Sequence, residues 1–465
     1  MTRKATIDDL KKGLEGKRVV VVGMAATGMA TAEFLTQRGA AVMVSEIKIE
    51  DEWGISPHQQ LRSLGVEVEW GKHSPETFLG GDLIVLSPGV DPVIPPLEQA
   101  RAQGIPIVSE VELASWFLSP PLIAVTGTNG KSTTTALIGH ILSGWGKRTF
   151  VGGNIGIPLI EYLLREKEAD YIVAEISSFQ LEAISSFSPW IALLLNLGED
   201  HLDRHPTFSA YAEVKGRIFL NQGPKDWAVI NNDDAAVRSL CTQITSQLLP
   251  FGRAGSGEKG VWLEAEDTII YRNDKGEKRF SLERVKIRGM HNCENIMAAI
   301  GAATICGVPP GAIQESLESF EGLEHRLEWV GAWRGVNVYN DSKATNVASA
   351  LRALMSLDAP IILLAGGRDK GGDYSLLRKP IEERATALIL MGEAKEKMQG
   401  AFRDLLPCHL VAGMEEGVRL AWKLARAGDV ILLSPACSSF DMFDDYRERG
   451  RTFKEIVRKL AEEEQ

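Results

Sequence analysis

The segment from Gly127 to Thr133 brings glycine, lysine and hydroxyl side chains together in an order that suits the binding of phosphate groups. Gly127 and Gly130 allow backbone N–H groups to converge on anionic oxygens, and the amino end of a following helix adds a positive field. Lys131 would neutralise the β- and γ-phosphates of a nucleotide, and the Ser132 hydroxyl could ligate Mg²⁺. These residue types therefore predict a nucleotide phosphate loop.

The segments on either side of this loop support the prediction. Ile123–Val125 has the composition of a buried strand, and Thr134–Leu142 has that of a helix. Strand, loop and helix in this order form the context that a phosphate loop requires. Val125 occupies the position five before Gly130, where the common G-x-x-x-x-G-K-[ST] pattern has its first glycine. The segment is therefore a shortened variant of that motif.

Three further side chains follow the predicted strands of the same region. Glu175 ends the strand Tyr171–Glu175, where a carboxylate is placed to hold Mg²⁺ through oxygen. His201 follows the next strand, Ile191–Leu195, and could reach the same crevice. Lys215 lies on the helix after that, and taken alone it is typical of a solvated helix face. Glu175 is therefore a candidate metal ligand beside the phosphate loop, and His201 is a candidate for the same crevice.

A second glycine-containing turn lies near the start of the chain, at Gly23–Gly28, after the predicted strand Arg18–Gly23. Its position is that of a dinucleotide-binding fingerprint, but Ala25 replaces the second glycine of G-x-G-x-x-G. The poor fit disfavours NAD or FAD. It favours a nucleotide of another kind, bound at the same strand ends.

Buried strands that alternate with helical segments predict doubly wound parallel α/β sheets along most of the chain. The strands are predicted at 18–23, 41–45, 83–86, 122–126, 171–175, 191–195, 227–230, 327–333, 336–339, 361–364, 387–391 and 430–434. Residues 260–282 favour short antiparallel strands, and residues 292–306 favour a helix. The pattern breaks at Pro120-Pro121 and near Phe320–Gly322. We therefore predict three domains, over residues 1–117, 118–321 and 322–465.

Composition narrows the classes of function. The 465 residues carry a formal net charge of −11, which disfavours non-specific binding to nucleic acid. The five cysteines are odd in number and form no C-x-x-C pair, so we expect reduced thiols in a cytoplasmic protein. Met1–Leu14 lacks the apolar centre of a signal peptide, and no apolar run approaches the ~20 residues of a membrane span. We therefore expect no nucleic-acid partner and no membrane partner.

The order of several motifs along the chain resembles that of the Mur ligase superfamily. The motifs are Gly127–Thr133, Gly153–Gly156, Glu175–Glu182, Glu199–His201, Lys215, Gly289–Asn292, Gly322–Arg326 and Asn340–Asn346. Gly366–Tyr374 and Ser434–Phe443 are similar, more narrowly, to the members that add D-glutamate. The resemblance covers the chain from about residue 16 to 460. Each motif is weak alone, but the ordered set is highly specific.

This resemblance implies an ATP-dependent amide-bond ligase of cytoplasmic peptidoglycan precursor synthesis. ATP would phosphorylate the alanyl carboxylate of UDP-N-acetylmuramoyl-L-alanine, and the amine of D-glutamate would attack the acyl phosphate. A carboxylate is inert to amines at neutral pH, so activation must come first, and cations must offset the repulsion between the anions. The implied fold is a Rossmann-like N-terminal domain, a central P-loop ATPase-type parallel sheet with a small antiparallel sheet, and a Rossmann-like C-terminal domain. Two Mg²⁺ sites and a monomer are expected.

The resemblance also implies roles for individual residues. Lys131, Glu175, His201 and Lys215 would be catalytic, and Lys215 would be carbamylated. The metal ligands would be Ser132, Glu175, His201 and carbamylated Lys215. The ATP contacts would be Gly127, Thr128, Asn129, Gly130, Lys131, Ser132, Thr133, Asn292, Asn295, His325, Arg326, Asp341 and Lys343. The UDP-substrate contacts would be Thr27, Gly28, Glu46, Ser87, Pro88, Gly89 and Asn154. The D-glutamate contacts would be Thr345, Lys370, Ser439 and Tyr446.

A carbamylated lysine has a chemical requirement of its own. Only an unprotonated amine captures CO₂, so the pKa of Lys215 would have to be lowered by a cationic or apolar site.

Four other interpretations remain open. An L-alanine-adding ligase also has a Rossmann-like first domain, but the segments at Lys370 and Ser434–Phe443 disfavour it. A folylpolyglutamate synthase shares the ATP loop but lacks a UDP domain of this sort. An NAD- or FAD-dependent oxidoreductase would use the Gly23 turn and leave the Lys131 loop unexplained. A motor or transport P-loop ATPase is disfavoured by the shortened loop and by the absence of a clear downstream signature.

Overall fold

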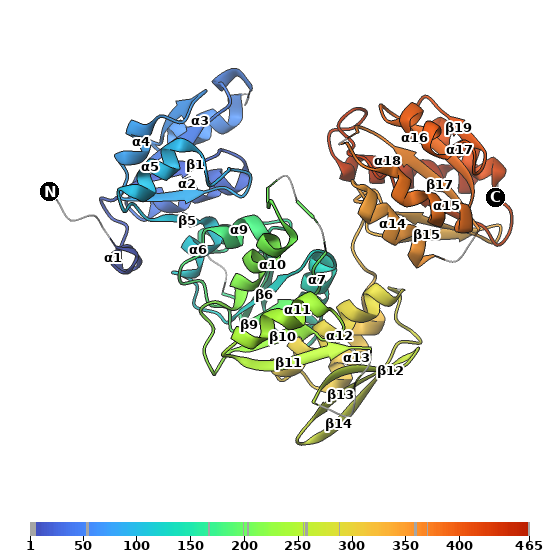
Figure 1. Ribbon diagram of the computed structural model, residues 1–465, viewed down its shortest axis with the longest axis horizontal. Coiled ribbons are helices and arrows are strands. Elements are labelled where there is room, and N and C mark those ends of the chain that lie inside the picture. The colour runs from blue at the N-terminus through green and yellow to red at the C-terminus, as the bar shows by residue number, and fades with distance from the viewer. Residues whose placement is uncertain are drawn as a thin grey trace. The chain divides into compact units, whose positions relative to one another are not determined.

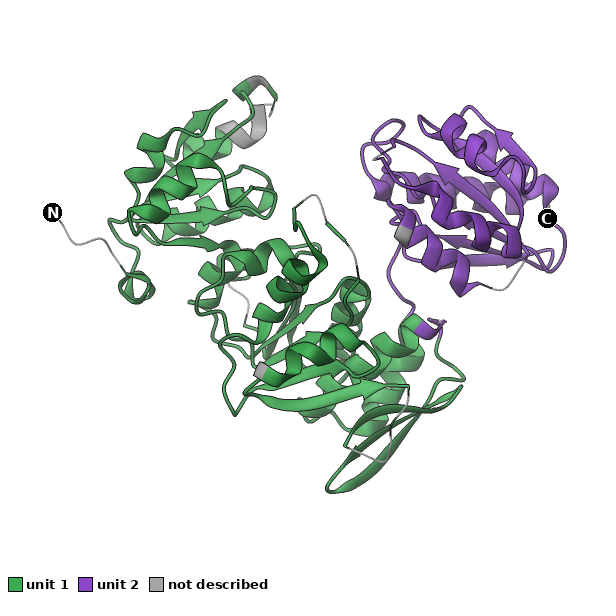
Figure 2. Ribbon diagram, in the orientation of Figure 1, with its two compact units in different colours: residues 1–285, 291–320 green, residues 286–290, 321–465 purple. Residues whose placement is uncertain are grey.

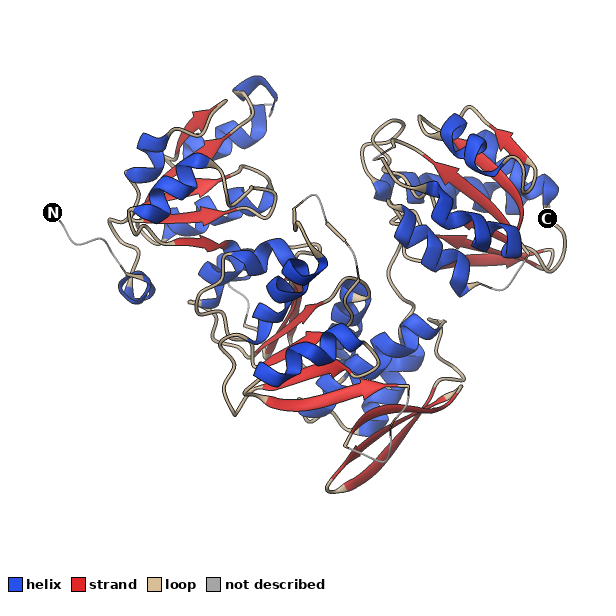
Figure 3. Cartoon of the chain, in the orientation of Figure 1, coloured by secondary structure: helices blue, strands red, loops and turns tan. Residues whose placement is uncertain are grey.

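The computed structural model describes residues 6–52, 55–165, 168–198, 200–201, 204–253, 255, 259–287, 289–357, 360–369 and 371–463. The chain divides into two compact units, one of residues 1–285 with 291–320 and one of residues 286–290 with 321–465 (Figure 2). Both units alternate strands with helices (Figures 1 and 3). The α/β class predicted from the sequence is confirmed, and the boundary predicted near residue 117 stays a prediction.

The first sheet of unit 1 is entirely parallel, with the order β3-β2-β1-β4-β5. Its strands are β1 (Arg18–Val22), β2 (Ala41–Glu46), β3 (Glu67–Trp70), β4 (Leu83–Leu86) and β5 (Ile107–Ser109). Its helical segments are α1 (Ile7–Lys12), α2 (Ala26–Gln37), η1 (Glu50–Glu52), α3 (Ile55–Ser63), α4 (Pro75–Leu79), α5 (Pro95–Ala102) and α6 (Glu110–Ser115). The strand order reverses direction between β1 and β4, which is where open α/β sheets bind ligands.

The second sheet of unit 1 has nine strands in the order β14-β13-β12-β11-β10-β9-β6-β8-β7. They are β6 (Leu122–Thr126), β7 (Thr149–Gly153), β8 (Tyr171–Glu175), β9 (Ile191–Leu194), β10 (Trp227–Asn231), β11 (Gln247–Gly252), β12 (Gly260–Ala265), β13 (Thr268–Asn273) and β14 (Gly276–Ser281). The antiparallel strands expected over 260–282 are present as β12–β14. They pair onto β11 and so extend the main sheet instead of forming a separate one.

The helices around this second sheet frame the candidate site. They are α7 (Lys131–Gly144), α8 (Leu159–Leu164), α9 (Ser178–Glu182), α10 (Phe208–Gly216), η2 (Arg217–Phe219), α11 (Ala235–Leu240), η3 (Cys241–Gln243), α12 (Met290–Ile305) and α13 (Pro310–Ser319). Strand β6 lies between β8 and β9, and all three are parallel. The segments that follow their carboxyl ends therefore meet at one edge of the sheet, where the predicted phosphate loop, Glu175 and His201 lie.

Unit 2 holds a six-stranded sheet in the order β15-β16-β20-β17-β18-β19. Its strands are β15 (Glu328–Trp333), β16 (Val336–Asn340), β17 (Ile361–Gly366), β18 (Ala385–Met391), β19 (Cys408–Leu410) and β20 (Val430–Leu433). Its helical segments are α14 (Val347–Ser356), η4 (Tyr374–Leu377), α15 (Arg378–Arg384), α16 (Lys395–Phe402), α17 (Met414–Leu424) and α18 (Tyr446–Glu463). Among the described residues, no helix is both long enough and apolar enough to cross a bilayer.

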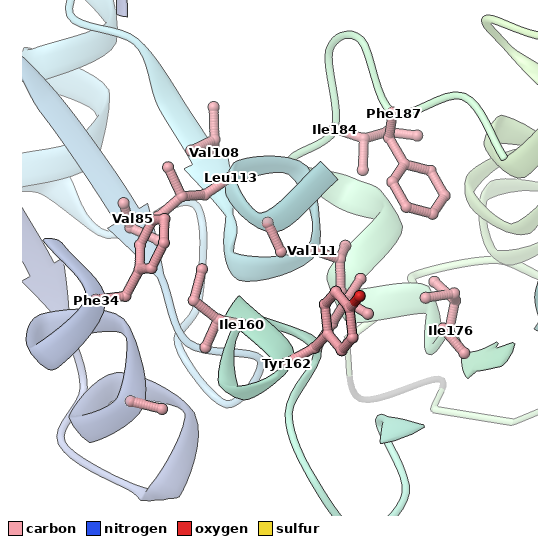
Figure 4. Close-up of a cluster of buried hydrophobic side chains, with 14 of the residues drawn as sticks. Phe34, Val85, Val108, Val111, Leu113, Ile160, Tyr162, Ile176, Ile184 and Phe187 are labelled. Carbon is pink, nitrogen blue, oxygen red and sulfur yellow. The ribbon is translucent and has the colours of Figure 1, made fainter. Parts of the chain in front are cut away.

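The two sheets of unit 1 share one hydrophobic cluster (Figure 4). Phe34 of α2 and Val85 of β4 belong to the same buried group as Ile160 of α8 and Phe187. Leu113 of α6 lies among them, with none of its surface exposed. Burial of apolar side chains gains about 25 cal/mol for each Å² removed from water, so this shared cluster holds the first sheet against the second.

A buried carboxylate adds a polar connection at the same place. Glu112 of α6 accepts hydrogen bonds from the backbone N–H of Ser185 (2.9 Å), Ser186 (2.9 Å) and Phe187 (2.7 Å) and from Nε1 of Trp116 (2.8 Å). Burial alone would raise the pKa of Glu112, but the hydrogen bonds outweigh it and hold this pKa below its usual value. The carboxylate therefore fastens α6 to the segment after α9 in its charged form.

Replacement of Glu112 by Gln is expected to lower the free energy of unfolding by about 2–4 kcal/mol, because hydrogen bonds to a buried charge are worth about 1.5–3 kcal/mol each. Urea unfolding followed by circular dichroism measures the change. The stabilisation should be fully present above the unfolded pKa of about 4.3 and disappear as the pH falls through the lower folded pKa. Glu98→Gln, at an exposed position of α5, is the control and should be neutral. Equal stability of the two variants would contradict the prediction.

Candidate active site

The predicted phosphate loop connects β6 to α7, and two glycines determine its path. Gly127 has φ +147° and Gly130 has φ +81°, a region that side chains with a Cβ rarely adopt. A Cβ at Gly127 would lie 3.1 Å from Cβ of Leu195, and a Cβ at Gly130 would collide with Oδ1 of Asn295. Both positions therefore require glycine, for reasons of conformation and of space.

No side chain of the residues that the structure describes caps the amino end of α7. Gly130 occupies the N-cap and has no side chain that could accept a hydrogen bond from the first turn. By contrast, Thr207 caps α10 by accepting from the backbone N–H of Ala210. The first N–H groups of a helix need an acceptor, and a phosphate is a suitable one.

The loop is held by the segment that follows β9. The backbone N–H of Asn129 donates to Oδ1 of Asn196 (2.8 Å), and Nδ2 of Asn196 donates back to the carbonyl of Asn129 (3.2 Å). The N–H of Gly198 donates to Oγ1 of Thr128 (3.0 Å). Our sequence reasoning missed Asn196 and Gly198 as functional residues, although they directly precede the Glu199–His201 motif.

Lys131 and Ser132 occupy the first turn of α7. Nζ of Lys131 donates to the carbonyls of Gly127 and Thr128, both at 2.8 Å, so its ammonium group lies over the loop. Oγ of Ser132 donates to Oε2 of Glu175 at 2.5 Å. The ammonium group of Lys131 and the oxygen atoms of Ser132 and Glu175 thus lie at the same end of α7.

Glu175 is held from two sides. Its Oε1 accepts from Nδ2 of Asn154 (2.7 Å), while its Oε2 accepts from Ser132. Glu175 is buried, with 3% of its surface exposed. Carboxylate and hydroxyl oxygens are the ligands that Mg²⁺ prefers, so this donor set fits that ion. Asn154, expected at the sugar-peptide part of a UDP substrate, here positions the candidate metal carboxylate.

Lys215 of α10 is buried, with 1% of its surface exposed. Its Nζ lies 3.4 Å from Oγ1 of Thr126 and 4.9 Å from the centre of the Tyr211 ring. Burial lowers the pKa of Lys215 well below its usual value, and the charge of Lys131 lowers it further, although Asp200 and Glu175 oppose this. Burial therefore favours the uncharged form of this amine more strongly than solvent would favour it in an exposed lysine.

His201 follows β9, and its described contacts are with Phe179 and Asp200. Its φ is +54°, its ring packs 4.8 Å from that of Phe179, and its Nε2 is 3.8 Å from the carboxylate of Asp200. Among the described residues, no hydrogen bond or ion pair joins His201 to Glu175 or Lys215. No group of three or more His, Cys, Asp or Glu side chains in the described ranges is arranged to hold a metal ion. Glu199 lies outside the described residues, and the two Mg²⁺ sites stay predictions.

Apart from Asn154, the candidate UDP-substrate residues lie near the point where the first sheet reverses its strand order. Oε2 of Glu46 accepts from the N–H of Met24 (2.8 Å), and its Oε1 accepts from the N–H of Lys48 (3.0 Å). Oγ of Ser87 donates to the carbonyl of Gly23 (3.2 Å). A Cβ at Gly28 would collide with that same carbonyl. The loops after β1, β2 and β4 are thus fastened to one another around the Gly23 turn. Thr27 lies on α2, and Pro88 and Gly89 lie in the loop after β4.

The candidate ATP residues divide between the two units. In unit 1, Nδ2 of Asn295 donates to Oδ1 of Asn292 (3.1 Å), and Oδ1 of Asn295 accepts from Oγ1 of Thr134 (3.3 Å) beside the phosphate loop. In unit 2, Asp341 follows β16 and accepts from Oγ of Ser434 (2.9 Å) and from the N–H of Leu327 (3.1 Å). Burial raises the pKa of Asp341 to about 7. The positive charge of Arg326 opposes that rise.

The remaining unit 2 candidates surround the start of α18. Nδ2 of Asn340 lies 2.9 Å from Nδ1 of the buried His325, and Nζ of Lys343 lies 4.0 Å from the centre of the Tyr446 ring. The N–H of Thr345 donates to the carbonyl of Lys343, and Ser439 is buried after β20. Lys370 lies outside the described residues.

Arg449 is a further residue that our sequence reasoning missed. It is buried, with 1% of its surface exposed, and donates to Oγ of Ser342 (3.0 Å) and to the carbonyls of Ser342 (2.8 Å), Cys437 (3.1 Å) and Ser438 (3.2 Å). It therefore joins the segment after β16 to the Ser434–Phe443 motif. In the sequence it is one of several arginines in a strongly charged helix, and nothing there marks it as buried.

Comparisons with known proteins identify the family of the chain. The family model described as "Mur ligase MurD-like, N-terminal domain" matches residues 17–109, "Mur ligase middle domain" matches 125–303, and "Mur ligase, glutamate ligase domain" matches 325–437. Among solved structures, the UDP-N-acetylmuramate-alanine ligase of Thermotoga maritima has a TM-score of 0.59 at 21% identity and covers 96% of this chain and 100% of its own. The MurF ligase of the same organism, solved with ADP, has a TM-score of 0.59 at 16% identity, covering 98% and 97%. These structures establish the fold.

Curated relatives are much closer in sequence. The UDP-N-acetylmuramoylalanine--D-glutamate ligase of Geotalea daltonii is 46% identical over 448 residues, which cover 96% of this chain and 98% of the relative. The enzyme of the same name from Koribacter versatilis is 44% identical over 455 residues, covering 97% and 99%. The chain therefore belongs to the Mur ligase family, and within that family to the UDP-N-acetylmuramoylalanine--D-glutamate ligases.

Proposed function

We propose that this ligase joins D-glutamate to UDP-N-acetylmuramoyl-L-alanine at the expense of ATP, in cytoplasmic peptidoglycan precursor synthesis. The observation that supports it most directly is the convergence of Lys131, Ser132 and Glu175 at the amino end of α7, with the buried side chain of Lys215 on the neighbouring Thr126. Such a group suits phosphoryl transfer to a carboxylate. The family membership supports the identity of the substrates.

The reaction has two steps. A carboxylate oxygen of the alanyl group attacks the γ-phosphorus of ATP, the bond from that phosphorus to the β–γ bridging oxygen breaks, and ADP leaves. The amine of D-glutamate then attacks the acyl carbon, inorganic phosphate leaves, and the amine loses a proton. Negative charge accumulates on the phosphoryl oxygens in the first step, so preorganised donors there lower the barrier.

We assign the unit 1 residues as follows. The N–H groups of residues 127–133 bind the phosphates, and Lys131 moves its ammonium donors from the loop carbonyls to the β- and γ-phosphates. Ser132 and Glu175 would hold Mg²⁺, which would supply positive charge against the phosphate oxygens. Asn154 keeps the Glu175 carboxylate oriented through its Nδ2 group.

Lys215 is proposed to act as a carbamate. Its unprotonated amine attacks CO₂, a C–N bond forms, and one proton leaves to solvent. The product is a carboxylate on a long arm, a type of oxygen ligand suited to a second Mg²⁺ together with His201. The burial of Lys215 and its lowered pKa support this assignment, because both favour the unprotonated, nucleophilic form of the amine.

The unit 2 residues are proposed to bind D-glutamate and part of ATP. Thr345, Lys370, Ser439 and the backbone of Tyr446 would contact D-glutamate. His325, Arg326, Asp341 and Lys343 would contact ATP. The elevated pKa of Asp341, about 7, leaves a large protonated fraction at neutral pH, so this group can donate as well as accept a hydrogen bond to a ribose hydroxyl. We propose that the enzyme acts as a monomer.

The function is tested by phosphate release from ATP in the presence of UDP-N-acetylmuramoyl-L-alanine. L-Alanine, D-glutamate, L-glutamate and L-lysine are offered separately, with a reaction lacking any amino acid as the control. Turnover is expected with D-glutamate and at most background release with the other three. Turnover that is independent of D-glutamate would contradict the proposal. Turnover with L-alanine on UDP-N-acetylmuramate would favour the L-alanine-adding alternative.

A further inference from the structure

Arg204 connects two loops of unit 1 that belong to different sheets. Its guanidinium group donates to both carboxylate oxygens of Glu182, through Nε (3.2 Å) and Nη2 (2.6 Å), and Nη2 also donates to the carbonyl of Val90 (2.8 Å). The side chain is 16% exposed and that of Glu182 is 14% exposed. The contact is therefore a shielded, charge-assisted one that links the central sheet to the loop after β4.

Val90 is firmly part of the candidate UDP-substrate region. It directly follows Ser87-Pro88-Gly89, and its N–H donates to the carbonyl of Ser87 (3.0 Å). Its Cγ2 would lie 3.3 Å from a Cβ placed on Gly23, so it also packs against the first glycine turn. A displacement of Val90 would therefore shift both turns around which the UDP group is proposed to bind.

The other end of Arg204 is fixed to the His201 segment. Its backbone N–H donates to the carbonyl of His201 (3.0 Å). Its guanidinium carbon lies 5.2 Å from the centre of the Phe179 ring, which also contacts the rings of His201 at 4.8 Å and of His205 at 5.9 Å. Arg204 thus holds His201 through the backbone and through a shared aromatic ring.

We propose that Arg204 is a positioning residue that couples the UDP-substrate loop to the His201 loop, so that the UDP-sugar and Mg²⁺ each strengthen the binding of the other. The inference rests on the proposed function. A guanidinium group presents a rigid fork that can bind a carboxylate with two donors while reaching a third acceptor, which a lysine ammonium on a flexible stem does not reproduce. Coupling between two ligands is reciprocal, so it can be measured from either side.

Arg217 provides a matched comparison. Its Nε and Nη2 donate to the carbonyls of Leu181 and Ile184, both at 2.8 Å, at the end of the same α9 segment. Within the described part of the chain, none of the hydrogen bonds of Arg217 is to Val90 or His201. Loss of the fork at Arg217 would therefore disturb local structure without breaking the connection between the two loops.

The test measures the dissociation constant of UDP-N-acetylmuramoyl-L-alanine by isothermal titration calorimetry, in EDTA and at saturating Mg²⁺. The wild-type protein should bind at least about fivefold more tightly with Mg²⁺, and Arg204→Lys should show less than about a twofold difference. Arg217→Lys should keep the wild-type ratio of the dissociation constant in EDTA to that in Mg²⁺. Glu182→Gln removes the partner carboxylate but leaves the Val90 carbonyl in place. This variant should also reduce the ratio, and it replaces Arg204→Lys in the test if that variant does not fold.

The measured ratios distinguish coupling through Arg204 from a general structural role of this residue. A wild-type ratio near one, or an undiminished ratio in both Arg204→Lys and Glu182→Gln, would overturn the coupling proposal. An equal loss in Arg217→Lys would show that Arg204 has only a general structural role. Failure of the wild-type protein to bind the UDP-sugar at all would overturn the proposed function itself, which is a distinct result from binding that is insensitive to Mg²⁺.

Discussion

Lys215→Ala is expected to reduce ligase turnover by about 10³-fold, with partial recovery when a short carboxylate such as acetate or formate is added. The loss is of the size seen when one preorganised electrostatic group is removed from an active site. Recovery is expected because the truncated side chain leaves room for a carboxylate to replace the carbamate as an oxygen ligand. Steady-state phosphate release, titrated with acetate against a chloride series of equal ionic strength, measures both effects.

Lys225→Ala is the control for this prediction, because Lys225 is the next lysine along the chain and is exposed. It should turn over at the wild-type rate and gain nothing from acetate. The carbamate itself can be sought by ¹³C NMR after incubation with ¹³C-bicarbonate, where the wild-type signal should be absent from Lys215→Ala. Full activity of Lys215→Ala, or an identical acetate response in the wild type, would argue against the carbamate.

Lys131→Ala is expected to lower kcat by about 10³-fold, because it removes the cation placed to meet charge that develops on the phosphoryl oxygens. The same substitution should act on Lys215. The charge of Lys131 is one cause of the lowered pKa of Lys215, so its removal lets that pKa rise and leaves less neutral amine to capture CO₂. Turnover and the ¹³C carbamate signal should therefore fall together in Lys131→Ala.

The carbamate measurement separates the two effects of Lys131. Lys131→Arg keeps the positive charge but cannot place a single ammonium over the carbonyls of Gly127 and Thr128. This variant should lose most of its turnover and retain its carbamate signal. A carbamate signal that is unchanged in Lys131→Ala would contradict the electrostatic link between the two lysines.

The parts of the fold that were predictable from sequence are those whose signal is local. β4, β6 and β8 have the predicted bounds, because buried parallel strands are continuous apolar runs between polar turns. β3 and β7 were not predicted. They lie at sheet edges, where no residue of β3 and only the last two residues of β7 are buried, so the composition of these strands is less distinctive.

The candidate site also contains some residues that could be predicted from the sequence and others that could not. The phosphate loop could be predicted because its glycines, lysine and serine are adjacent in sequence and act through the backbone between them. Lys215 illustrates the opposite case: in sequence it is typical of a solvated helix face, and only the packing of α10 against β6 reveals that it is buried. Glu112, Arg204 and Arg449 were missed for this reason, since what distinguishes a buried charge is the partner that folding brings to it.

The hydrophobic cluster shared by the two sheets of unit 1 bears on how such enzymes can be recombined. Phe34, Leu113 and Ile160 belong to one continuous group, and a cut near residue 117 would divide it (Figure 4). A chimera that takes its first 117 residues from one Mur ligase and the remainder from another must match both halves of this cluster, together with the Glu112 acceptor and its N–H donors. Crossover at residues 286–290 and 321, where the two compact units divide, places no such demand on the cluster. The first sheet, which is proposed to bind the UDP group, is thus inherited together with the phosphate loop.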